Sequence, residues 1–194
     1  MPPQPERRFL TATPAVTGRT IFGYAARFNS RSENLGTTDQ PIFEIIKPGA
    51  FDSVLKDDVR ALFNHDSNLI LARSKNGKGT LKLSIDTIGL RYEFEAPETQ
   101  VGNDLLVSIK RGDIDQSSFS FSIAPGGDSW SNEGRNRIRT IMKIKTLHDV
   151  SPVTSPGYLE TSVSARKSSP KPIVPMAELD PSFLALRLGL KSKR

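Results

Sequence analysis

The stretch "QSSFSFSI", residues 116–123, alternates small hydroxyl side chains with large apolar ones. Successive side chains of a β-strand point to opposite faces of the sheet, so this alternation predicts a strand. Its two faces carry different chemistry, with Phe119, Phe121 and Ile123 on one and Ser118, Ser120 and Ser122 on the other. The serine face leaves space that suits a substrate, although the commoner reason for such alternation is the polar outer face of a half-buried strand.

The rest of the chain is also rich in strand patterns. Turn-forming clusters of Gly, Pro, Asn and Asp separate further alternating, β-branched or aromatic stretches at residues 20–28, 41–46, 80–86, 89–96 and 137–147. Among these strands, helices are expected at residues 48–57 and 98–113. The sequence therefore predicts a β-rich α+β fold, a mostly antiparallel β-barrel with a few surrounding helices, because closure removes exposed sheet edges.

Composition excludes several kinds of chemistry. The 194 residues contain no cysteine, which rules out disulfides, thiolate catalysis, cysteine zinc sites and iron–sulfur clusters. No apolar run approaches the roughly 20 residues that cross a bilayer, and the start "MPPQPERRFL" lacks the apolar region of a signal peptide. We therefore expect a cytoplasmic protein with no membrane partner.

The positive charge lies mainly at the C-terminal end. The net charge is +6, yet residues 166–194 hold seven basic and two acidic residues, which leaves residues 1–165 nearly neutral. We expect one domain over residues 1–165, followed by a basic, proline-rich linker. The linker would end in a short amphipathic helix with Phe183, Leu186 and Leu190 on one stripe. This distribution makes nucleic acid an unlikely partner for the domain.

The two histidines each precede an aspartate. His65 lies in "NHD" (residues 64–66), where it is either a general base or a turn residue. The second histidine lies in "LHDVS" (residues 147–151), which reads as a strand. Its predicted faces are Leu147, Asp149 and Ser151 on one side and His148 and Val150 on the other. Only one of His148 and Asp149 can therefore face a site.

Several separated motifs, in this order and spacing, resemble the prohead maturation proteases of tailed bacteriophages. They are "FEIIKPGAFD" (43–52), "VRALFNHDSNLILARSKNGKGTLKLSID" (59–86), "GL" (89–90), "RGDIDQSSFSF" (111–121) and "LHDVSPVTSPGY" (147–158). The resemblance spans about residues 20–165. That family is similar to the herpesvirus capsid-assembly proteases, which are serine peptidases built on a β-barrel with surrounding helices.

The resemblance also implies a catalytic set. The family's serine falls on Ser118, its histidine on His65 and its third position on Asp149, with His148 as the alternative if the strand register shifts by one residue. Serine would attack, histidine would move the proton, and the acidic residue would orient the imidazole. This chemistry requires no cofactor and no metal.

The implied function is that of a serine endopeptidase of phage capsid maturation. Its expected substrates are the scaffold protein or a scaffold-like segment of the major capsid protein, and itself as well. It would act inside the prohead, in the host cytoplasm. The related herpesvirus enzymes depend on dimerisation, which leaves a homodimer open for this chain.

Two other functions compete with this one. The protein could be a non-catalytic capsid-assembly or nucleic-acid-binding module whose basic tail contacts phosphates. The pairs His65–Asp66 and His148–Asp149 could instead bind a divalent ion in a phosphohydrolase. Such His-Asp enzymes are normally helical, and the strand pattern argues against that reading.

Overall fold

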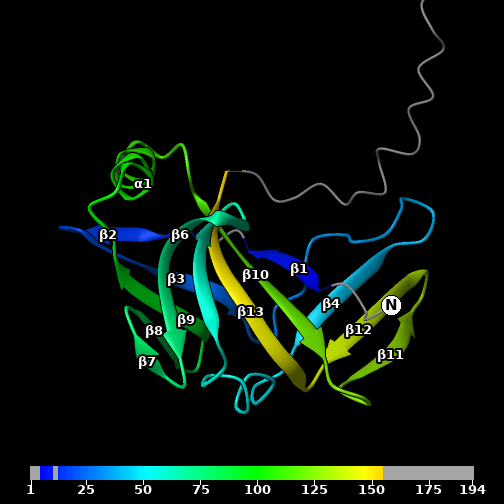
Figure 1. Cartoon of the computed structure of the whole chain (residues 1–194). Helices are drawn as coiled ribbons and strands as arrows, with labels where there is room; N and C mark the ends of the chain where they lie inside the picture. The colour runs from blue at the N-terminus through cyan, green and yellow to red at the C-terminus, as the bar shows by residue number, and fades with distance from the viewer. Residues whose placement is uncertain (1–4, 11–12, 155–194) are drawn as a thin grey trace, which may run out of the picture. The chain divides into compact units, whose positions relative to one another are not determined.

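The computed structural model describes residues 5–10 and 13–154 of the chain. Within these residues the backbone forms thirteen strands and one helix (Figure 1). The predicted boundary at residue 165 and the predicted C-terminal helix lie outside the described residues. No helix in the described part is long and apolar enough to cross a membrane.

The largest sheet has six strands. In spatial order they are β1 (Glu6–Leu10), β10 (Gln116–Ile123), β13 (Ile144–Val153), β5 (Val59–Phe63), β6 (Asp66–Lys75) and β7 (Lys78–Gly79). Neighbouring strands in it are antiparallel except β13 and β5, which run parallel. This parallel pairing brings together segments that are almost 90 residues apart in sequence, with Asp149 opposite Arg60.

Two smaller sheets complete the described strands. One has three strands, in the order β11 (Asp128–Glu133), β12 (Asn136–Ile141) and β4 (Ile42–Ile46). The other has four, in the order β2 (Ala15–Thr17), β3 (Thr20–Arg27), β9 (Gly89–Glu95) and β8 (Leu81–Ile85). The β-rich α+β prediction is confirmed. Closure into a barrel is not, because the three described sheets are open and β1 and β7 are edge strands of the largest one.

The helix α1 (Gln100–Arg111) confirms the expectation for residues 98–113. The Thr99 side chain accepts a hydrogen bond from the Gly102 N–H at its start. At its end Gly112 has φ 83°, a left-handed conformation that glycine adopts without steric cost. Leu105, Leu106 and Ile109 form its buried stripe.

The prediction of a helix at residues 48–57 is wrong. Successive turns occupy this segment, with hydrogen bonds that span three residues, such as Val54 N–H to the Phe51 carbonyl. Gly49 has φ 89°, which a right-handed helix does not allow. Ala50, Phe51 and Val54 are nonetheless buried. The spacing of apolar residues that suggested a helix therefore marks the buried side of a series of turns.

The alternation of β10 places its apolar face in the core, as predicted. Phe119 and Phe121 are buried and stacked, with ring centroids 4.9 Å apart, and the Phe51 ring contacts Phe119 edge-on. Ser118 and Ser120 on the opposite face are buried as well, so that face is not an outer polar surface. Other residues of the protein therefore shield the serine face of β10 from solvent.

Ser117 lies on the core face of β10, next to a buried tyrosine. The Tyr92 hydroxyl is 2.8 Å from the Ser117 hydroxyl, and both residues are fully buried. Burial raises the pKa of the Tyr92 phenol, so it stays protonated and able to donate. This pair joins the six-stranded sheet to the four-stranded one.

We predict that Tyr92→Phe lowers the free energy of unfolding by about 1 kcal/mol, because it removes one buried hydrogen bond while keeping the ring in place. Urea denaturation measures this loss. Tyr24→Phe is the matched control, since the Tyr24 hydroxyl bonds Asp86 at the surface. An equal loss in both variants would contradict the role given to the buried pair.

Candidate active site

His65 lies in the tight turn between β5 and β6. Phe63 pairs with Asp66, so Asn64 and His65 form a two-residue hairpin loop. Both have positive φ, 54° and 57°, as a type I′ turn requires at its two central positions. A left-handed conformation is uncommon for residues other than glycine, and from this turn the His65 side chain contacts Asp149 and Ser118.

Hydrogen bonds from Asn64 join the end of β13 to this turn. The Asn64 N–H donates to the Pro152 carbonyl at 3.1 Å, and the Asn64 Oδ1 accepts from the Thr154 N–H at 2.9 Å. The turn is therefore fixed against the strand that carries Asp149. The sequence analysis placed Asn64 in a possible turn, but it did not predict that Asn64 holds the end of β13, because that contact forms only in the folded protein.

A β-bulge at His148 sets the direction of Asp149. Phe121 pairs with Leu147, while Ser120 pairs with Asp149, so His148 is an extra residue on β13. Leu147 is consequently buried in the apolar core, whereas Asp149 faces His65. The expectation that Leu147 and Asp149 share a face is wrong, because regular alternation does not survive an inserted residue.

The His65 imidazole bridges two strands. Its Nδ1 is 2.5 Å from Asp149 Oδ1, and its Nε2 is 2.5 Å from Ser118 Oγ. The three residues predicted together thus lie in one hydrogen-bonded chain. With Nδ1–H donating to the carboxylate, Nε2 is left to accept the serine proton.

These side chains are well shielded from solvent. The exposed fraction is 4% for the His65 side chain and 10% for that of Asp149, and Ser118 is fully buried. Ser151, which sequence reasoning placed only on a face, donates its hydroxyl to Asp149 Oδ1 at 2.8 Å. Asp149 therefore has two donors that hold its position.

The alternative residues are engaged elsewhere. His148 Nε2 is 2.9 Å from Ser122 Oγ, on a part of β13 that does not reach His65. Ser117 bonds Tyr92 in the core. The structure thus brings Asp149, and not His148, to His65.

The two His-Asp pairs do not gather into a metal centre. Asp66 lies at the start of β6 and its Oδ1 accepts from the Asn68 backbone N–H at 2.8 Å. Across residues 5–10 and 13–154, no group of three or more His, Asp or Glu side chains could hold a metal ion. Nothing in this geometry favours the phosphohydrolase reading.

A comparison with protein-family models identifies the family of the chain. The model of the Caudovirus prohead serine protease family matches residues 10–173. The chain belongs to this family. The prohead protease is thus a serine peptidase of phage capsid maturation, as the motifs implied. No curated protein and no solved structure matches it significantly.

We predict that Asn64→Ala lowers the free energy of unfolding by about 1–2 kcal/mol, because alanine is strained at positive φ and lacks the bond to Thr154. Asn64→Gly keeps the turn and loses only that bond, so its loss should be smaller. Urea denaturation of both variants measures the difference. Equal losses would mean that the left-handed backbone costs alanine nothing here.

Proposed function

We propose that Ser118, His65 and Asp149 are the catalytic triad of this prohead protease. The observation that carries this proposal is the pair of 2.5 Å contacts made by the two imidazole nitrogens of His65. A serine hydroxyl becomes an effective nucleophile when a base takes its proton, and the base works best when a third group fixes its tautomer.

In this mechanism, Ser118 Oγ attacks the carbonyl carbon of the scissile peptide bond while His65 Nε2 takes the hydroxyl proton. The imidazolium then gives that proton to the leaving amine. The Asp149 carboxylate orients the ring and stabilises its positive charge. Ser151 is a positioning residue, since its hydroxyl donates to the Asp149 oxygen that faces His65.

We further propose that the enzyme is an endopeptidase whose substrates are the scaffold protein or a scaffold-like segment of the major capsid protein, and also its own chain. It acts inside the prohead, in the host cytoplasm, where confinement raises the local concentrations of enzyme and substrate. Residues 1–165 form the protease domain in this proposal, and residues 166–194 form a tail that carries it into the shell. The chemistry requires no cofactor.

The first test is co-expression of the protein with the capsid and scaffold proteins of the same phage. We predict that the wild type yields defined fragments by intact mass, and that Ser118→Ala and His65→Ala yield uncut proteins. Assembled shells with the same uncut masses for all three proteins would reject the peptidase proposal and favour a non-catalytic assembly module.

The second test separates Asp149 from its neighbour. We predict that Asp149→Asn lowers the cleavage rate on the order of 10³–10⁴-fold, because an amide favours the wrong tautomer of His65. His148→Ala should leave the rate within about twofold, since the His148 imidazole bonds Ser122 rather than a member of the proposed triad. A loss in His148→Ala as large as that in Asp149→Asn would overturn the assignment of the third member.

A further inference from the structure

Strand β1 covers the strand that carries Ser118. It pairs antiparallel with β10 along the five residues around the proposed nucleophile, with Phe9 opposite Ser118 and Arg8 opposite Phe119. Figure 1 shows β1 beside β10, at the edge of the six-stranded sheet. An extended peptide binds most simply by adding a strand to such an edge, and here β1 already occupies it.

The backbone of β1 competes with His65 for one proton. Ser118 Oγ lies 2.9 Å from the Arg8 carbonyl oxygen and 2.5 Å from His65 Nε2. A hydroxyl has a single hydrogen, so it donates either to the carbonyl or to the imidazole. When it donates to Arg8, His65 is not positioned to remove that proton. The β1 backbone thus offers the Ser118 hydroxyl an acceptor other than His65.

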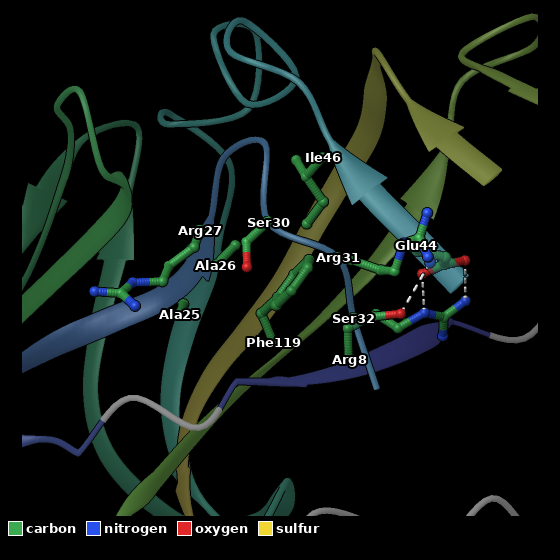
Figure 2. Close-up of a pocket in the computed structure, with 10 residues that line it drawn as sticks. All are labelled: Arg8, Ala25, Ala26, Arg27, Ser30, Arg31, Ser32, Glu44, Ile46 and Phe119. Atoms are coloured by element: carbon green, nitrogen blue, oxygen red, sulfur yellow. Dashed lines mark hydrogen bonds and ion pairs between the residues drawn. The ribbon is translucent and has the colours of Figure 1, made fainter. Parts of the chain in front are cut away.

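Side-chain ion pairs hold β1 in this position. The Arg8 guanidinium bonds Glu44 on β4 through two nitrogens, Nε to Oε2 and Nη2 to Oε1. The Arg139 guanidinium on β12 bonds Glu6 at 2.5 Å and Glu44 at 3.0 Å. Figure 2 shows the Arg8 and Glu44 side chains joined by dashed lines, in a pocket that Phe119 also lines. A bidentate arginine–carboxylate pair of this kind fixes geometry as well as charge.

The Arg8–Glu44 ion pair, here called the latch, includes a carboxylate that is almost completely buried. The exposed fraction of the Glu44 side chain is 4%, and that of Arg8 is 18%. A buried carboxylate that loses a cationic partner is destabilised, so the loss of Arg8 favours another cation in its place beside Glu44. Arg139 alone makes a single contact of 3.0 Å with Glu44.

We propose that β1 is an inhibitory strand that occupies the substrate-binding edge of β10, and that substrates displace it as extended segments carrying Arg or Lys opposite Phe119, where Glu44 recognises the basic side chain. This inference rests on the proposed function, because it assigns substrate recognition and control to the same site. The family match begins at residue 10, so nearly all of β1 precedes it.

Labelling of Ser118 by a fluorophosphonate probe tests the proposal that β1 is an inhibitory strand. Its oxygen–phosphorus bond forms as fluoride leaves and His65 takes the proton, so the rate reports both access and activation. We expect Arg8→Ala to label at least about tenfold faster than wild type, as loss of a charge-assisted pair predicts. Arg7→Ala is the matched control, since exposed Arg7 removes the same charge from the same strand. Its rate should equal that of wild type.

Equal labelling rates for wild type, Arg7→Ala and Arg8→Ala would overturn the inhibitory role. If Arg8→Ala does not fold, Glu44→Gln opens the same latch from the other side and must label faster. Capsid cleavage by the same preparations distinguishes failure of the inhibitory-strand proposal from failure of the peptidase assignment. Cleavage that depends on Ser118, with equal labelling rates, defeats only the inhibitory strand. Absence of both labelling and cleavage in every variant defeats the peptidase assignment itself.

Peptide competition tests the proposal that Glu44 recognises a basic side chain of the substrate. A synthetic peptide with the sequence of β1, ERRFL, should slow the labelling of Arg8→Ala by reoccupying the edge of β10. The matched peptide ERAFL, which lacks the arginine that meets Glu44, should be at least about tenfold weaker. Equal effects of the two peptides, or none from either, would overturn the recognition of a basic side chain by Glu44.

Discussion

The arrangement of the site depends on one imidazole that joins two strands at the tip of a hairpin. His65 belongs to neither of the strands that it contacts, so its position relies on the turn and on the clip between Asn64 and the end of β13. This is an economical solution for a small domain, since a two-residue turn has few conformations. A longer loop would have to lose more conformational entropy to hold the ring at 2.5 Å from two partners.

The bulge at His148 solves a second geometric problem. β13 must bury Leu147 and Val150 against the core while it turns Asp149 and Ser151 toward His65. Strict alternation would place Leu147 on the same face as Asp149. One inserted residue satisfies both demands, and it leaves His148 to bond Ser122 outside the site.

The sequence allowed some of these features to be predicted and not others. The alternation of β10 predicted the faces of Phe119 and Ser118, because a buried strand beside an aromatic core keeps its period. The bulge was not predictable, since it depends on pairing between strands rather than on the order of residues in one of them. The turns at residues 48–57 were taken for a helix, because buried Phe51 and Val54 have helical spacing. Arg8 and Glu44 carry no local signal at all, because they meet only in the folded protein.

The parallel pairing of β13 with β5 has a consequence for the time at which the enzyme forms. His65 is synthesised early and Asp149 late, and β13 is the last strand of the described chain. The central position of the six-stranded sheet, between β10 and β5, stays empty until that strand emerges from the ribosome and docks. A nascent chain therefore carries the serine and the histidine without their carboxylate. In the proposed triad, the order of synthesis would delay proteolysis until β13 has docked.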